Sequence, residues 1–148
     1  MVRMSSGLEN ALMTNSGLAQ VMNFGVIDCY SGPPPDRPDL PATGTLIGRV
    51  TDEAKTFTPN NRDAGLELRR VLPGILQDKG QWKLRAASSG EIGWWRWRWN
   101  QFDPDTESVF YPRVDGLVDD SLVLAANTVA KGDIIDLQQF IVRFRSGE

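Results

Sequence analysis

From Gly65 onward the chain is a succession of short segments in which apolar and polar residues alternate. These segments occupy residues 66–70, 81–86, 92–102, 108–114, 122–128 and 133–145. Turn-forming residues separate them, at 73–74, 88–90, 113–116 and 130–133. Side chains alternate between the two faces of a strand, so the pattern predicts strands that bury one face. Strands separated only by turns predict an all-β, mainly antiparallel sandwich or barrel.

The first half of the chain adds two strands and the only helical pattern. Residues 24–31 and 45–51 are strand-like. Between residues 7 and 22, apolar side chains recur at steps of three and four, which predicts a helix capped by Ser5 or Ser6. Two short helices broken at residues 15–17 fit the pattern equally well. We therefore expect an N-terminal helical segment (1–23) followed by a β-sandwich domain (24–148).

Two local irregularities refine this picture. The strand at 24–31 stops at Gly32, which is followed directly by Pro33, Pro34 and Pro35. Proline has no N–H to donate to a sheet ladder, so residues 32–41 are predicted to form an extended surface loop. The alternation in the last segment slips by one residue near Gln138, which predicts a β-bulge there.

The most unusual segment is the tryptophan-rich run of residues 94–99. On a strand, Trp95, Trp97 and Trp99 point one way, whereas Trp94, Arg96 and Arg98 point the other way. One interpretation is a stacking platform for sugar or single-stranded nucleic acid. The interpretation that we favour is an amphipathic strand with a tryptophan-lined core face and an arginine-bearing outer face. The arginine face is also a candidate surface for a protein partner, because Trp and Arg are enriched at interfaces.

Composition limits the chemistry that the chain can perform. Histidine is absent and Cys29 is the single cysteine, which excludes the usual catalytic triads and most zinc sites. We therefore expect no enzyme activity, no metal and no cofactor, and a Cys29 that is small, buried and inert. The net charge of −3 gives no field to attract nucleic acid or an anionic membrane.

The sequence also gives no sign of a calcium-binding loop, a membrane helix or a signal peptide. The stretches at 103–107 and 115–120 lack the spacing of a calcium-binding loop and are predicted to be solvated turns. No apolar run approaches the roughly 20 residues of a membrane helix. No apolar segment of signal-peptide type follows Arg3, so we expect no export by that route.

Six blocks of the sequence resemble, in the same order, a family of small tailed-bacteriophage proteins. The blocks are residues 7–12 (GLENAL), 26–35 (VIDCYSGPPP), 42–47 (ATGTLI), 93–97 (GWWRW), 112–116 (PRVDG) and 134–140 (IIDLQQF). Each block is short, and together they span most of the chain. The polar stretch at 51–63 and the richer tryptophan strand depart from the shorter members of the family.

The resemblance implies a jelly-roll capsid cement, or decoration, protein. Such a protein binds the outer surface of the major capsid protein lattice and stabilises it, so the implied location is the virion, assembled in the host cytoplasm. We expect self-association as a dimer or trimer, and neither membrane nor nucleic acid as a partner. The alternatives are another phage structural component, in the tail or neck, and a carbohydrate- or nucleic-acid-binding module that uses residues 94–99.

Three groups of residues are candidates for the contact with a partner. They are the apolar stripe of the N-terminal segment, the proline run and the outer face of the tryptophan strand. A preorganised proline loop loses little entropy when it docks. The candidate residues are Leu8, Leu12, Leu18, Met22, Pro33, Pro34, Pro35, Arg96 and Arg98.

Overall fold

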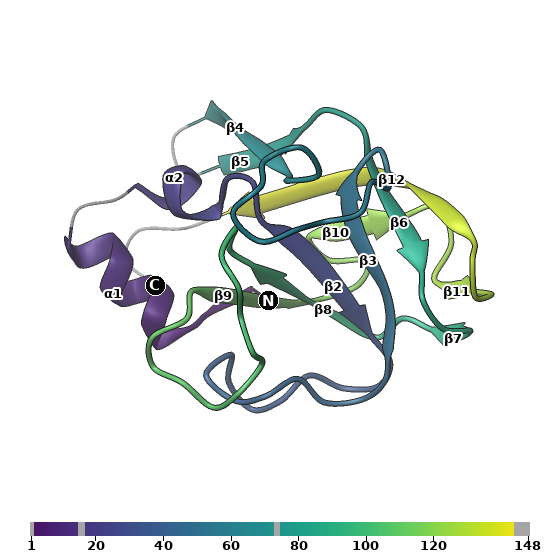
Figure 1. Cartoon of the computed structure of the whole chain (residues 1–148), viewed down its shortest axis with the longest axis horizontal. Coiled ribbons are helices and arrows are strands. Elements are labelled where there is room, and N and C mark those ends of the chain that lie inside the picture. The colour runs from purple at the N-terminus through teal and green to yellow at the C-terminus, as the bar shows by residue number, and fades with distance from the viewer. Residues whose placement is uncertain (1, 15–16, 73–74, 144–148) are drawn as a thin grey trace.

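A computed structural model describes residues 2–14, 17–72 and 75–143, and the described chain is mostly antiparallel β-structure (Figure 1). The helices are α1 (Ser6–Thr14) and α2 (Leu18–Met22). The strands are β1 (Arg3–Met4), β2 (Val26–Tyr30), β3 (Leu46–Asp52), β4 (Glu67–Leu72), β5 (Ile75–Lys79), β6 (Trp82–Ala86), β7 (Gly90–Glu91), β8 (Trp94–Arg98), β9 (Arg113–Leu117), β10 (Leu122–Leu124), β11 (Thr128–Val129) and β12 (Ile134–Arg143). The all-β prediction is confirmed. The predicted turn at 73–74 and the end of the last predicted strand lie outside the described residues.

Hydrogen bonds connect ten of the strands into one strongly curled sheet rather than into two separate sheets. Its order is β1-β9-β8-β2-β3-β6-β12-β5-β4, and β10 also pairs with β12. Strands β7 and β11 form a small second sheet. Every named strand pair is antiparallel. The curl encloses an apolar core whose large side chains include Trp82, Trp95, Trp97 and Phe140.

The predicted bulge near Gln138 is confirmed. Val123 on β10 lies opposite Gln139 on β12, and the next residue, Leu124, lies opposite Leu137. Gln138 is therefore the extra residue on β12. The bulge shifts the inward–outward alternation of side chains along β12 by one residue. As a result, Phe140 faces the core and is buried.

The prediction of a strand at 108–114 followed by a turn at 113–116 is wrong. Residues 108–111 belong to a loop, and the strand β9 begins only at Arg113 and runs through Gly116. Gly116 has a packing role here, because a Cβ at this position would lie 2.4 Å from Cζ2 of Trp95. The glycine thus makes room for an indole ring on the neighbouring strand, rather than for a change of chain direction.

The N-terminal segment forms two short helices, as the second of the two predicted arrangements has it. The N-terminal cap of α1 is Ser5, whose Oγ accepts a hydrogen bond from the backbone N–H of Leu8 at 3.1 Å. Both helices lie at one end of the sheet, on the left of Figure 1. Leu8 and Met22 are fully buried in the same apolar core as the strands.

Candidate functional site

A row of alternating charges crosses four adjacent strands on the face of the sheet that turns away from the apolar core. Its residues lie in direct register on β9, β8, β2 and β3, and they are Asp115, Arg96, Asp28 and Arg49. Asp115 accepts two hydrogen bonds from Arg96, at 2.7 and 2.9 Å. Asp28 accepts two from Arg49, at 2.6 and 3.1 Å. Opposite charges directly across a sheet stabilise the pairing of the strands.

A second set of charges joins this row to the loop between β8 and β9. Arg98 donates to Asp28 on β2 at 2.8 Å and to Asp105 in the loop at 2.9 Å. Arg113 donates to both carboxylate oxygens of Asp103 at 2.8 Å. Each arginine therefore spans from the sheet to the loop. Bidentate pairs of this kind fix the position of the carboxylate as well as its charge.

Most of these charges are buried, with Arg49 and Asp105 partly exposed, and burial shifts the pKa values of several of them. Desolvation raises the pKa of Asp115 above its usual value even beside Arg96. At Asp103, burial also raises the pKa, but hydrogen bonds from Arg113 and the charge of Arg98 outweigh it, so the pKa falls below its usual value. Burial likewise raises the pKa of Tyr30, whose hydroxyl accepts a hydrogen bond from Arg98 at 2.7 Å. Burial and the neighbouring arginines therefore act in opposite directions on these groups, and the balance differs from one carboxylate to the next.

Two loops lie against this charged face and hide it from solvent. One is the 31–45 loop, between β2 and β3, and the other is the 99–112 loop, between β8 and β9; they run side by side along the lower edge of Figure 1. Ser108 N–H donates to the Asp39 carbonyl at 2.9 Å, and Ala42 N–H donates to the Asp105 carboxylate at 3.1 Å. The loops are therefore bonded to each other as well as to the sheet.

The proline-rich loop is held through its carbonyl groups. Arg113 donates to the carbonyls of Pro38 and Asp39, at 3.2 and 3.3 Å, and Arg96 donates to that of Leu40 at 2.8 Å. A proline-rich backbone offers acceptors and few donors, which matches the donor-only guanidinium group. The side chain of Asp39 in turn binds the N–H and hydroxyl of Ser6, at 2.7 and 2.6 Å, at the start of α1. The same loop therefore anchors the helix.

These contacts overturn two expectations. Arg96 and Arg98 do lie on the face opposite Trp95 and Trp97, but they are buried under the loops and bonded internally, so they present no arginine surface to a partner. The acidic stretches are not simply solvated turns, because the side chains of Asp103 and Asp115 are each 1% exposed. The physical reason is the same in both cases: opposite charges allow a polar face to be covered.

The other candidate contacts divide between buried and accessible positions. Leu8 and Met22 belong to the core of their own chain and are not available to a partner. Leu12 and Leu18 are partly buried and pack against that core. In the proline run, exposure falls along the sequence: Pro33 is exposed, Pro34 is partly buried and Pro35 is buried.

The tryptophan strand is buried on both faces. The prediction that Trp95 and Trp97 lie in the core is confirmed, whereas Trp99 is only partly buried at the end of the strand. Trp94, which was expected on the outer face, is also fully buried, and its ring stacks on Tyr30 with the centroids 4.8 Å apart. Of the tryptophans in residues 94–99, Trp99 alone retains an accessible surface that a ligand could stack on.

The 99–112 loop carries three of the most exposed apolar side chains, which sequence reasoning missed. Phe102, Val109 and Phe110 are 66%, 73% and 65% exposed. Phe110 makes an edge contact with Trp99, with the ring centroids 6.0 Å apart. The alternating pattern predicts strands at 92–102 and 108–114, so it assigns these three side chains to strands and gives no sign that they lie on an exposed loop. A loop that is tied down on its inner side and apolar on its outer side is suited to binding a partner.

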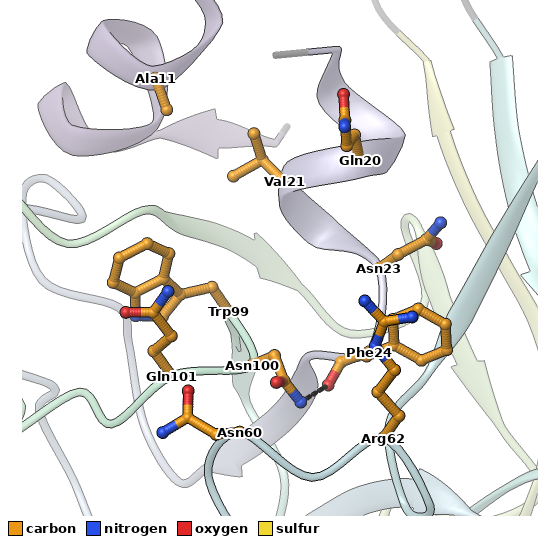
Figure 2. A pocket seen from close by; sticks show the side chains of 10 residues that line it. All are labelled: Ala11, Gln20, Val21, Asn23, Phe24, Asn60, Arg62, Trp99, Asn100 and Gln101. Carbon is orange, nitrogen blue, oxygen red and sulfur yellow. Dashed lines mark hydrogen bonds between the residues drawn. The ribbon is translucent and has the colours of Figure 1, made fainter. Parts of the chain in front are cut away.

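A pocket of about 490 Å³ opens beside this loop, between the helices and the end of β8. Figure 2 shows the ring of Trp99 and the amide of Gln101 on one side of it, and Phe24 with Arg62 on the other. Its lining residues are Ala11, Gln20, Val21, Asn23, Phe24, Asn60, Arg62, Trp99, Asn100 and Gln101. Five of these ten carry a side-chain amide.

The described residues form neither a metal-binding cluster nor a membrane-spanning helix. Within residues 2–14, 17–72 and 75–143, no three His, Cys, Asp or Glu side chains are arranged to hold a metal ion. In the same residues, no helix is long and apolar enough to cross a membrane. Cys29 is buried, as expected, and desolvation raises the pKa of its thiol far above the usual range. No protein-family model, curated protein or solved structure matches this chain.

Proposed function

We propose that this protein is a jelly-roll-like decoration protein that binds the outer surface of a phage capsid and stabilises the lattice of the major capsid protein. The observation that carries the proposal is the 99–112 loop, which exposes Phe102, Val109 and Phe110 while buried ion pairs fix its inner side. The ordered sequence blocks shared with the tailed-phage family supply the identity of the partner. The same proposal places the protein on the virion.

The physical basis of this function is mass action with a preorganised surface. A protein that binds the assembled lattice but not its separate subunits stabilises the lattice by its binding free energy. A rigid loop loses little conformational entropy on docking. Most of the favourable free energy of its apolar contacts therefore contributes to the affinity. Many identical contacts on one shell add avidity, and self-association as a dimer or trimer would increase it further.

The N-terminal segment has a smaller part in this proposal than the sequence suggested. Leu8 and Met22 belong to the core, so deleting residues 1–22 would remove part of the fold along with any contact. The exposed loop side chains can be changed without opening the core. They therefore provide a cleaner test of capsid binding.

The test measures the occupancy of this protein on capsid shells. Shells are assembled from the major capsid protein of the same genome and incubated with wild-type chain or with Val109→Ser/Phe110→Ser. We expect wild-type protein to co-sediment with the shells and to raise their rupture temperature, and the double variant to lose most of its occupancy. Met13→Ser is the matched control, since Met13 is 86% exposed on α1. Failure of the wild-type chain to bind shells would refute the proposal, and full binding by the loop variant would remove the loop from it.

A further inference from the structure

We propose that the pocket beside Trp99 is a binding site for a neutral saccharide. This site adjoins the exposed side chains of the 99–112 loop, whose first residues Trp99, Asn100 and Gln101 line it, but it does not depend on attachment to a capsid. Its volume of about 490 Å³ lies within the roughly 300–1,000 Å³ that is typical of small-molecule sites. Four separate parts of the chain build it: the two helices, Phe24, the loop that carries Asn60 and Arg62, and the end of β8.

The chemistry of the lining indicates the class of ligand. A sugar ring has an apolar face of C–H groups and a rim of hydroxyls that both donate and accept hydrogen bonds. Trp99 supplies an aromatic surface for the first, and side-chain amides, which also donate and accept, suit the second. The amide residues are Gln20, Asn23, Asn60, Asn100 and Gln101.

The charges at the pocket favour a neutral ligand. Among the ten lining residues there is no carboxylate and no lysine. The single cationic group, Arg62, has its guanidinium carbon 4.7 Å from the centre of the Phe24 ring, so it is packed against that ring. An anionic ligand would find a single cation, whose guanidinium group is packed on the Phe24 ring, and a cationic ligand would find no counter-charge among the lining residues.

Two of the amides are held in fixed orientations by the fold. The Nδ2 group of Asn100 donates to the carbonyls of Phe24 and Asn61, both at 2.9 Å, which leaves its Oδ1 as an acceptor. The Oδ1 atom of Asn23 accepts from the N–H of Leu68 at 2.9 Å, which leaves its Nδ2 as a donor. Asn100 therefore offers one preorganised acceptor at the pocket before any ligand arrives, whereas the amide of Asn23 points away from the cavity in Figure 2.

Asn60 shows a further sign of a built site. Its backbone has a φ of 68°, in the left-handed region, and its N–H donates to the carbonyl of Asn100 at 2.8 Å. Trp99 is also positioned by its neighbours, because its ring packs against both Phe110 and Tyr111 while its indole N–H is buried with no hydrogen-bond acceptor among the described residues. The lining of the pocket is thus held by contacts among its own residues and with Phe110, Tyr111 and Leu68 outside it.

The experiment titrates the full chain with four defined probes: cellohexaose, chitohexaose, maltohexaose and mannohexaose. Binding is followed in ¹H–¹⁵N spectra by the indole resonance of Trp99, which is assigned from its disappearance in Trp99→Phe. We expect at least one probe to shift this resonance and to saturate it at millimolar or lower concentration. We also expect Gln101→Ala to weaken the binding about three- to tenfold, the effect of losing one neutral hydrogen bond.

The control is Gln138→Ala, which removes an exposed amide on β12 far outside the pocket lining and should leave the affinity unchanged. Absence of a saturable shift with all four probes would overturn the proposal, as would equal affinity of the wild-type chain and Gln101→Ala. Hexaglycine is titrated in parallel. A saturable shift with this peptide, and with none of the sugars, would show that the amides bind a peptide backbone and would also overturn it.

Discussion

Arg96 on β8 and Asp115 on β9 face each other directly across the sheet as a buried bidentate pair. Nε of Arg96 lies 2.7 Å from Oδ1 of Asp115, and its Nη2 lies 2.9 Å from Oδ2. The side chains are 0% and 1% exposed. The remaining nitrogen of Arg96 donates to the carbonyl of Leu40. One guanidinium group therefore joins two strands and holds the proline-rich loop over them.

Removing the carboxylate of Asp115 should destabilise the fold strongly, because both of its oxygens accept hydrogen bonds from the buried Arg96. Asp115→Asn leaves the buried guanidinium of Arg96 with only the partly exposed Asp105, at 3.2 Å, as a counter-ion. We expect a loss of about 3–5 kcal/mol in the free energy of unfolding, measured by urea denaturation. The double variant Arg96→Met/Asp115→Leu should lose less than the sum of the two single variants, because it buries no unpaired charge. Surface substitutions usually change the free energy of unfolding by no more than about 0.5 kcal/mol. A loss of less than about 1 kcal/mol for Asp115→Asn would therefore contradict a structural role for this ion pair.

Trp97 should be a principal contributor to the apolar core. Its side chain is 2% exposed, so Trp97→Ala should lower the free energy of unfolding by about 3–5 kcal/mol. The matched control is Phe102→Ala, an aromatic truncation at an exposed position, which should stay within about 0.5 kcal/mol of wild type. Equal effects of the two changes in thermal or chemical denaturation would show that Trp97 is not a core residue.

The alternation of residues predicted the strands but not what covers them. It placed Trp95 and Trp97 on one face and Arg96 on the other, and this part is confirmed. It could not show that the second face is buried as well, because the covering groups come from distant segments. The carbonyl of Pro38, for example, reaches Arg113 across 75 positions of the sequence. Periodicity describes one strand at a time and carries no information on such contacts.

One sequence signal could have identified the buried network. Asp28 is flanked by Ile27 and Cys29 in an otherwise apolar strand, and all three are buried. A single charged residue in an apolar strand requires an opposite charge nearby, because an unpaired buried charge is too costly. The Asp-Gly pair at 115–116 misled the prediction, since it usually marks a turn. Here the glycine accommodates an indole ring, which only the pairing of β8 and β9 reveals.

Cys29 should be unreactive while the protein is folded. Its side chain is fully buried, and desolvation raises the pKa of the thiol, with a smaller contribution from the charge of Asp28. The thiolate is the reactive form, so a disulfide reagent such as DTNB should modify the native chain only at the rate of unfolding. In concentrated guanidinium chloride the single thiol should react at once. Rapid modification of the native protein would show that the β2 strand opens locally.

The last prediction concerns acid. The pKa of Asp103 is lowered in the folded state because hydrogen bonds from Arg113 and the charge of Arg98 outweigh the opposing effect of burial. Its carboxylate therefore contributes stability that is present above the unfolded pKa of about 3.9 and is lost as the pH falls through the lower folded pKa. Asp115 has the opposite sign, because burial raises its pKa; its contribution is present below the unfolded pKa and is lost as the pH rises through the folded value.

Two substitutions separate these contributions, with the free energy of unfolding measured by urea from neutral pH to about pH 3, just below the unfolded pKa of an aspartate. Asp103→Asn should be less stable than wild type at neutral pH, and the difference should shrink below about pH 4, where Asp103 of the unfolded wild-type chain takes up a proton while the folded chain still holds it ionised. Glu107→Gln is the control: this carboxylate is 67% exposed and its ion pair among the described residues is with the exposed Arg37, so the pH profile of this variant should follow wild type. A constant difference between wild type and Asp103→Asn across the whole range would mean that the arginines do not depress the pKa of Asp103, and that the loop is held by geometry rather than by charge.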